Sequence, residues 1–397
     1  MGWSTGPLRE RSTWLGALVM FAVGAALSAP FFSAISKLGR RTDLAWHAEL
    51  VIESRSQPNQ LSYSVYYWLL DTLSGRGDLD ALIAVAMVLV SVAYGLRVAL
   101  TWLVFSMVGL GMVGRVVGTV AASIAGPITV SAQDDIYLGK LSPVIWHNST
   151  TILAVPFALL LFASTCWLLT RPRVSIRAHV VQLALVLLSG WTKPNFILAF
   201  IPALAVWCVI AVGAAPAGER GATFRELWRK AAPSGIVAAA ILVTQYVLTY
   251  SGPGLQMLGQ SVSNVFDPFA VWELWSTAFG VRPFVTVPTS LITPLVLSLL
   301  VWRGKGYRLP LVLAWLAVVV GLLQFTLFAE ALADGTILFH GNWIWGAQIS
   351  MAILFCLTLS AFMREWETLP WPKWIGFFLA AFQVVVGVGW IVVLLRP

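Results

Sequence analysis

The chain has 397 residues, of which 59% are hydrophobic and only 11% are charged. Soluble domains carry about a quarter charged residues, so this composition excludes a soluble globular enzyme, a disordered protein and a secreted disulfide-rich scaffold. The net charge of +8 would suggest nucleic-acid binding in a soluble protein. In a membrane protein it reflects Lys and Arg held in cytosolic loops, so we expect no nucleic-acid partner.

Apolar runs follow one another along the whole chain and leave only loops between them. They lie near residues 13–33, 81–112, 114–131, 151–170, 178–192, 195–213, 233–250, 285–302, 309–329, 343–362 and 374–395. A helical span needs about 20 apolar residues. The predicted fold is therefore an all-α polytopic membrane protein with about 11 transmembrane helices, forming one transmembrane domain over residues 1–397.

Two of these runs need separate interpretation. The run 13–33 follows two arginines but is long and lacks a clean cleavage signal, so we interpret it as an anchor rather than a signal peptide. The run 81–112 is too long for one simple span. It is either one long tilted helix or a span followed by an interfacial helix.

Lys and Arg are distributed unevenly between the two sets of loops. With a cytosolic N-terminus, only nine of the 25 lie outside: Lys37, Arg40, Arg41, Arg55, Arg76, Lys140, Lys193, Arg282 and Arg396. Positive residues concentrate in cytosolic loops, which favours this orientation. Most of the acids and three of the four histidines fall outside. We therefore expect the titratable chemistry on the outer face, in a bacterial plasma membrane with the site facing the periplasm.

The first outer loop, residues 36–80, is long for a connector between spans. It predicts two short helices lying at the membrane surface and broken at Pro58. Asp43 and His47 are four residues apart, so they share one helix face. They are either a carboxylate and an imidazole that meet a polar substrate, or the solvated polar face of an interfacial helix.

The second outer loop, residues 131–150, begins with two adjacent acids, Asp134 and Asp135. An acid pair at this position can bind a divalent cation or orient sugar hydroxyls. It can equally cap the helix that follows. His147 and Asn148 end the same loop.

Lys193 lies between two short apolar runs, beside Gly190 and Pro194. A buried lysine needs an anionic partner or a water-filled cavity, so it either binds a phosphate near the outer leaflet or snorkels from a helix end. Further along, residues 329–346 place more polar groups on the same outer face. These are Glu330, Asp334, His340 and Asn342.

Four segments together resemble the C-type integral-membrane glycosyltransferases (GT-C), which use sugars linked to lipid phosphates. They are Arg41-Thr42-Asp43-Leu44-Ala45-Trp46-His47, Gln57-Pro58-Asn59-Gln60-Leu61-Ser62-Tyr63, Asp134-Asp135-Ile136-Tyr137-Leu138-Gly139 with Trp146-His147-Asn148, and Thr192-Lys193-Pro194-Asn195-Phe196. The resemblance covers residues 10–215, the N-terminal module that the superfamily shares. Residues 216–397 correspond to its variable C-terminal helices, so this chain resembles a compact member.

The resemblance implies transfer of a sugar from a polyprenyl-phosphate donor to a glycan, lipid or protein acceptor on the extracytoplasmic face. The usual base, an acid of the first outer loop, corresponds to Asp43. The other catalytic candidates are Asp134, Asp135 and His47. The departing phosphate anion needs cations, and Arg40, Arg41, Lys193 and Arg282 are candidates. The remaining predicted substrate-binding residues are Tyr137, His147, Asn148, Glu330, His340 and Asn342.

The resemblance leaves the cofactor open. Some members of the superfamily hold a divalent cation, Mg or Mn, with acids of the first two loops, and many need no metal. Asp43, Asp134 and Asp135 are the candidate ligands here. No nucleotide-binding motif is expected, because the donor is a lipid.

Two other classes of function compete with the transferase hypothesis. A transporter or flippase would place charges in the middle of spans and often shows internal repeats. A polysaccharide polymerase or ligase would share the lipid-linked donor but would concentrate Arg and His in a large late outer loop. Here the charges gather in the outer loops and the largest polar loop comes first, which favours the transferase.

Overall fold

The structure is a computed structural model that describes residues 6–37, 42–56, 64–128, 139–250, 256–257, 260–304, 306–339 and 341–396. The helices are α1 (Arg11–Lys37), α2 (Leu44–Ser54), α3 (Val65–Leu73), α4 (Leu79–Met107), α5 (Met112–Ile124), α6 (Ser149–Thr170), α7 (Ile176–Thr192), α8 (Asn195–Ala214), α9 (Arg220–Tyr250), α10 (Ala270–Phe279), α11 (Pro283–Ser290), α12 (Ile292–Val301), α13 (Arg308–Leu327), α14 (Trp345–Glu365) and α15 (Lys373–Leu394). Short 3-10 turns cover Pro7–Arg9 and Asn342–Ile344.

Nine helices within the described ranges are long and apolar enough to cross a membrane, as a polytopic helical membrane protein requires. Two further apolar runs of the expected 11 form shorter helices. α5 has 13 residues and α7 has 17. At 1.5 Å per residue, α5 covers only about 20 Å of a hydrocarbon core of about 30 Å.

Prolines explain both short helices. The run 114–131 contains Gly126-Pro127, and α5 ends just before this pair. α7 ends just before Lys193-Pro194, where Lys193 is extended, with φ −158° and ψ 114°. The residue before a proline is disfavoured in the helical region, so neither run continues as a helix. By contrast, the run 81–112 contains one continuous long helix, α4.

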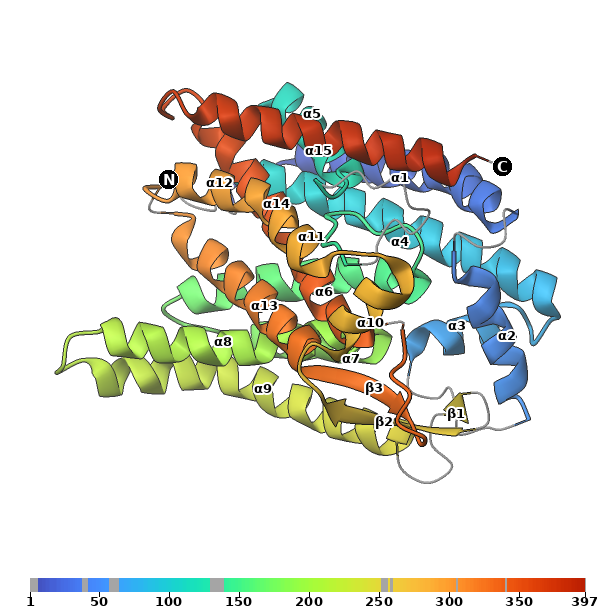
Figure 1. The fold of residues 1–397 in the computed structure, drawn as a ribbon. Coiled ribbons are helices and arrows are strands. Elements are labelled where there is room, and N and C mark those ends of the chain that lie inside the picture. The colour runs from blue at the N-terminus through green and yellow to red at the C-terminus, as the bar shows by residue number, and fades with distance from the viewer. Residues whose placement is uncertain are drawn as a thin grey trace.

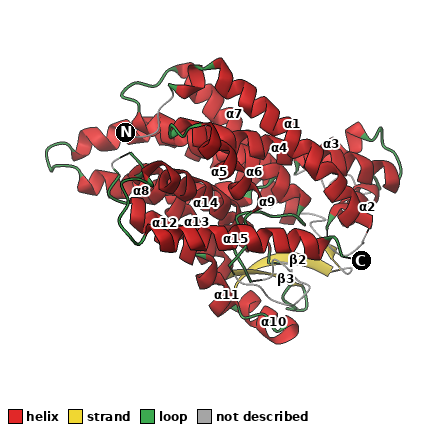
Figure 2. Cartoon of the chain, turned by 90° about the horizontal axis from the view of Figure 1, so that it is seen from above, coloured by secondary structure: helices red, strands yellow, loops and turns green. Residues whose placement is uncertain are grey.

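The bundle has two distinct ends. The short helices α2 and α3 lie at one end, together with the three strands, while the turn between α8 and α9 lies at the opposite end (Figure 1). The view from above shows the same arrangement, with the N-terminus near the α8–α9 end and the C-terminus at the other (Figure 2). The two short helices predicted for the first outer loop are thus present, on either side of a segment that lies outside the described residues.

A small sheet was not predicted. β1 (Gln256–Met257), β2 (Gln260–Phe266) and β3 (Phe328–Leu332) form three antiparallel strands, in which Asn264 of β2 pairs with Glu330 of β3. Neither QSVSNVF (Gln260–Phe266) nor FAEAL (Phe328–Leu332) shows the regular alternation of apolar and polar residues that predicts a strand. The sheet fixes Glu330 at the end of the bundle that carries α2 and α3.

Residues 139–146 run through the protein interior without helical structure, and all are buried. Buried backbone groups need partners, and side chains of α4, α11 and α14 supply them. The Gln348 amide of α14 accepts from Ser142 N at 2.8 Å and donates to Lys140 O at 2.6 Å. Arg97 of α4 donates to Pro143 O at 2.8 Å. This buried segment delivers His147 and Asn148 to the N-terminus of α6.

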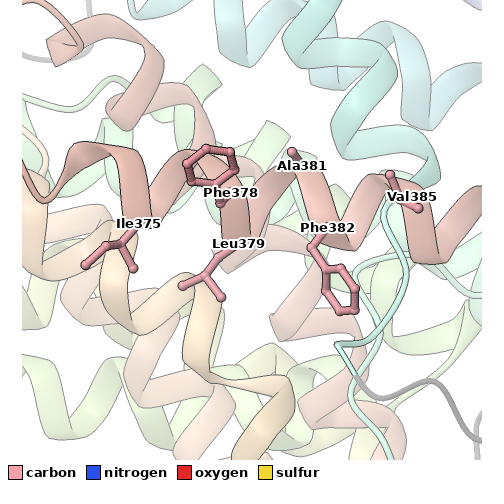
Figure 3. Close-up of a pocket in the computed structure, with 6 residues that line it drawn as sticks. All are labelled: Ile375, Phe378, Leu379, Ala381, Phe382 and Val385. Atoms are coloured by element: carbon pink, nitrogen blue, oxygen red, sulfur yellow. The ribbon is translucent and has the colours of Figure 1, made fainter.

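An apolar hollow lies on the exposed face of α15 (Figure 3). It is lined by Ile375, Phe378, Leu379, Ala381, Phe382 and Val385. Hydrocarbon from a single helix is what a lipid-facing surface presents, and no titratable side chain lines the hollow. It therefore offers packing for acyl chains rather than chemistry.

Replacing Gly387 by Ala is expected to destabilise the protein. α15 crosses the end of α5 at Gly387, where an added Cβ would lie 1.7 Å from Ile124 O. Overpacking of this kind costs about 1–3 kcal/mol, so thermal unfolding of purified Gly387→Ala should occur several degrees lower. Gly389→Ala is the matched control on the same helix, because a Cβ there meets no atom within 4 Å. Equal melting temperatures for the two variants would contradict this packing.

Candidate functional site

Asp43 lies between α2 and α6 and connects them. It is the N-cap residue of α2, but its side chain makes no capping bond to that helix. Instead, Oδ1 accepts from Ser149 N and Ser149 Oγ, each at 2.9 Å, at the first residue of α6. The carboxylate therefore lies at a helix N-terminus, where the helix dipole favours negative charge. Its side chain is 16% exposed, so one edge still reaches solvent.

His47 lies one turn along α2 and joins Asp43 to α3. Its Nε2 lies 3.0 Å from Asp43 Oδ2, and its Nδ1 lies 2.8 Å from the Tyr67 hydroxyl. An ionised carboxylate can only accept, so Nε2 carries the proton toward Asp43, and in the neutral imidazole Nδ1 accepts from the Tyr67 hydroxyl. His47 is only 4% exposed. The two side chains meet on one face of α2, as predicted, and His47 is not solvated there.

The electrostatic surroundings keep Asp43 ionised. Burial alone would raise the pKa of this carboxyl, but His47, His147 and the Ser149 amide together hold it below its usual range. Burial lowers the pKa of His147 to about 4, helped by Lys193 and opposed by Asp43. At neutral pH the site thus holds a carboxylate beside a neutral imidazole.

Lys193 lies at the break between α7 and α8, as the sequence predicted. Its Nζ donates to Asn148 Oδ1 and Thr150 Oγ1, each at 2.8 Å. It also lies 4.7 Å from the centre of the Trp345 ring. Burial lowers its pKa to about 7, opposed by the charge of Asp43. With this pKa, about half of the lysine is protonated at pH 7, and a bound anion would raise the protonated fraction.

Asn148 links the lysine to the start of α6. Its Oδ1 caps the helix by accepting from Thr151 N at 2.9 Å, and the same oxygen accepts from Lys193. The Trp345 ring also packs against His147, with ring centres 5.5 Å apart. Asp43, His147, Asn148 and Lys193 therefore form one polar cluster around the N-terminus of α6.

A second group lies on the far side of the α7–α8 break. Asn342 Nδ2 donates to Glu330 Oε2 at 2.6 Å, and Asn195 Nδ2 donates to the Asn342 carbonyl at 2.7 Å. Glu330 is only 6% exposed. Lys193 and Asn195 flank Pro194, so the break connects the polar cluster to residues 329–346, which we call the late loop.

No protein-family model matches this chain, and no curated protein does either. The residues themselves therefore carry the functional argument. The predicted Asp43, His47, His147, Asn148, Lys193, Glu330 and Asn342 are all brought to the same end of the bundle. Arg40, Arg41, Asp134, Asp135, Tyr137 and His340 lie outside the described residues. Arg282 is exposed at the start of α11.

The metal hypothesis stays open. Among the residues that the structure describes, no three His, Cys, Asp or Glu side chains gather as metal ligands. The two further candidate ligands, Asp134 and Asp135, fall outside those ranges. Asp43 already accepts three hydrogen bonds, so a cation there would have to displace a donor. We therefore derive no step through a metal.

Four contributors to the site were not among the predicted site residues. Tyr67 and Ser149 hold His47 and Asp43, while Thr150 and Trp345 hold Lys193. The only sequence signals were that Tyr67 lies in an aromatic-rich stretch and that Ser149-Thr150 directly follow His147-Asn148. Trp345 gives no signal of its own, because tryptophans are common throughout this chain.

Proposed function

We propose that this protein is a membrane glycosyltransferase that moves a sugar from a polyprenyl-phosphate donor to an acceptor hydroxyl. The observation that carries the proposal is the meeting of Asp43 and Lys193 at the N-terminus of α6. A glycosyl displacement needs a base for the acceptor hydroxyl and a cation for the departing phosphate. The carboxylate of Asp43 and the buried amine of Lys193 can supply these two groups. The resemblance of residues 10–215 to the GT-C module supports the same chemistry.

Asp43 is the proposed base. A carboxylate offers about four lone-pair sites, and His47 and Ser149 use three of them. The remaining site can take the proton of the acceptor hydroxyl as its oxygen attacks the anomeric carbon. The bond from that carbon to the donor phosphate breaks as the new bond forms. A single displacement of this kind inverts the anomeric centre.

Lys193 is the proposed partner of the departing phosphate. An ammonium group can donate three hydrogen bonds, and Asn148 and Thr150 accept two of them. The third can reach an anion, and charge-assisted bonds of this type are the strong ones. The amide groups at the start of α6 add the favourable end of a helix dipole.

Glu330 and Asn342 are proposed to bind sugar hydroxyls. A buried carboxylate and an amide held 2.6 Å apart offer acceptors and donors together, which suits vicinal hydroxyl groups. The late loop belongs to the variable half of the chain, residues 216–397, so it is where donor or acceptor specificity would differ between related enzymes.

A transport function is less well supported. Transporters use charged groups within spans, and Arg97 is such a group in α4. Its guanidinium donates to Ala122 O at 3.2 Å and Pro143 O at 2.8 Å. A structural role in holding the buried segment 139–146 therefore accounts for Arg97 without a transported ligand.

The sidedness of the site follows from the distribution of Lys and Arg, which favours a cytosolic N-terminus and a site facing the periplasm. Ser56 follows α2 and is exposed at the site end of the bundle. Ser56→Cys should therefore react with an impermeant thiol reagent in intact cells. Reaction only after permeabilisation would reverse the orientation.

Tyr67→Phe is expected to reduce turnover and to shift the acid limb of the profile of kcat/KM against pH to higher pH. The substitution removes the donor to His47 Nδ1, so Nε2–H is no longer held on Asp43 and the pKa of the carboxyl rises. Activity is then lost at a higher pH as the pH falls. The loss of one hydrogen bond corresponds to about 0.5–1.5 kcal/mol, a factor of roughly 2–12 in turnover. The measurement is kcat/KM against pH.

Tyr94→Phe is the matched control for Tyr67→Phe. The Tyr94 hydroxyl also makes one buried hydrogen bond, to Ser123 O at 2.5 Å, and takes no part in the Asp43–His47–Tyr67 chain. A purely structural role for Tyr67 predicts lower stability with an unchanged acid limb. An unmoved limb in Tyr67→Phe would therefore contradict the positioning role.

Product stereochemistry tests the proposed reaction. Purified protein is given polyprenyl-phosphate sugars of known anomeric configuration, and the product is analysed by NMR. We expect the opposite configuration in the product and no transfer from nucleotide sugars. Retention of configuration would contradict a single displacement with Asp43 as base.

A further inference from the structure

The end of the bundle opposite the site carries a basic surface. It is formed by the turn between α6 and α7 and by the first turns of α9. Its six exposed arginines are Arg171, Arg173, Arg177, Arg220, Arg225 and Arg229. We call this set the basic end surface.

One buried lysine joins the two parts of this surface. Lys230 Nζ donates to Leu169 O at 3.3 Å, so the first turns of α9 are fixed against the last turn of α6. The same Nζ bonds Glu226 Oε1 at 2.5 Å. Glu226 is thereby paired with the buried lysine rather than with an arginine of the surface.

Most of the positive charge on this surface is not neutralised by the protein. Arg220 donates to the carbonyls of Gly213 and Ala215 at the end of α8. On this surface, whose six arginines all lie in the described part of the chain, Arg171 contacts only the Trp167 ring, and four further arginine side chains have no hydrogen bond or ion pair. They are Arg173, Arg177, Arg225 and Arg229. Unpaired guanidinium groups that share one surface attract anions whose oxygen pairs match the planar guanidinium fork, such as phosphate.

Exposed aromatic rings lie beside these arginines. Phe224 and Trp228 are 53% and 59% exposed, and their rings stack with centres 6.0 Å apart. They precede Arg225 and Arg229 by one residue each, so rings and charges run along neighbouring stripes of α9. Aromatic rings next to arginines are typical of helix segments at the boundary between lipid and water.

The position along the bundle fits a headgroup layer. α6 has 22 residues and runs from the polar cluster at Ser149 to the basic end surface at Thr170. At 1.5 Å per residue it spans about 33 Å, close to the thickness of the hydrocarbon core of about 30 Å. The basic end surface therefore lies at the depth of lipid phosphates in the leaflet opposite the site.

We propose that the basic end surface binds the headgroups of anionic phospholipids. The arginines hold lipid phosphates, and Phe224 and Trp228 insert at the level of the upper acyl chains. A site of this kind fixes the depth of α6 and α9 in the bilayer. The proposal is independent of the transferase chemistry, because it concerns the other end of the bundle.

Lipid binding by the full-length protein tests this proposal. The protein in neutral detergent is titrated with fluorescent phosphatidylglycerol, and affinity is read from energy transfer from tryptophan. Each basic residue near an anionic surface contributes about fivefold in affinity. We expect Arg225→Gln/Arg229→Gln to weaken phosphatidylglycerol binding by roughly 25-fold, with phosphatidylcholine binding unchanged.

The matched control removes two arginines from the opposite end of the bundle. Arg76 and Arg396 are exposed there, so Arg76→Gln/Arg396→Gln lowers the net charge equally. This control should bind phosphatidylglycerol like the wild type. Equal weakening in both double variants would show that only net charge matters and would overturn the proposal. The proposal would also be overturned if inorganic phosphate displaced the fluorescent phosphatidylglycerol as effectively as unlabelled phosphatidylglycerol does, because the surface would then bind free anions rather than lipid.

Discussion

Asp43→Asn is expected to abolish sugar transfer while leaving donor binding intact. The amide keeps the size of the side chain but cannot take up the acceptor proton, and general-base catalysis contributes about 10²–10⁴ in rate. Turnover should therefore fall by about that factor, with KM for the donor changed little. Single-turnover transfer and donor binding are measured on the same preparation. Transfer that survives would move the base to Asp134 or Asp135.

Folding of Asp43→Asn needs its own measurement. Oδ1 of the asparagine can still accept from Ser149, so the link from α2 to α6 remains. The link to His47 is the one at risk, because an amide nitrogen at the Oδ2 position would face Nε2–H. A melting temperature equal to that of the wild type would show that the loss of transfer reflects removal of the base. A much lower melting temperature would attribute the loss to unfolding.

Lys193→Met is expected to weaken donor binding strongly. A hydrogen bond between charged groups contributes about 1.5–3 kcal/mol, which corresponds to roughly 10- to 150-fold in affinity. KM for the donor should rise by that factor. Because Asn148 still caps α6 by accepting from Thr151 N, the fold should persist. Lys193→Arg is the control that keeps the charge, and it should retain part of the affinity.

The pH dependence of donor binding distinguishes this role from packing. The pKa of Lys193 is about 7 without ligand, so phosphate binding above that pH requires proton uptake. Wild-type affinity should then fall about tenfold per pH unit well above pH 7. Lys193→Met should show no such fall. An unchanged KM with an unchanged pH profile would count against phosphate binding.

Lys193→Met should also stabilise the empty protein at neutral and acidic pH. The lowered pKa means that the unfolded chain binds a proton more readily between about pH 7 and 10.4, so the penalty of burying Lys193 is largest below pH 7 and disappears above pH 10.4. The melting temperature of the variant should exceed that of the wild type at pH 6.5, and the difference should shrink as the pH rises.

The local features of the site that could be predicted are those set by neighbouring residues. Asp43 and His47 meet because four residues make one helical turn, and Lys193 ends a helix because Pro194 follows it. The two short helices of the first outer loop could also be predicted from their mixed charges and aromatic residues. Each of these depends on spacing within a single segment.

Features that depend on distant segments could not be predicted. Ser149 reaches Asp43 across 106 positions of the chain, and Gln348 holds Ser142 across 206. Hydropathy also does not register the breaks at Pro127 and Pro194, which shorten α5 and α7 to 13 and 17 residues. The buried course of residues 139–146 depends on Gln348 and Arg97, whose roles appear only in the folded bundle.

The most direct test of the central claim is release of polyprenyl phosphate by the purified wild-type protein. The protein in nanodiscs is offered a panel of polyprenyl-phosphate sugars together with a broad acceptor set, and free polyprenyl phosphate and glycosylated product are quantified. The proposed chemistry predicts that one donor is consumed with equal amounts of both products. Donors that bind but are never consumed would contradict it and favour transport of the lipid-linked sugar.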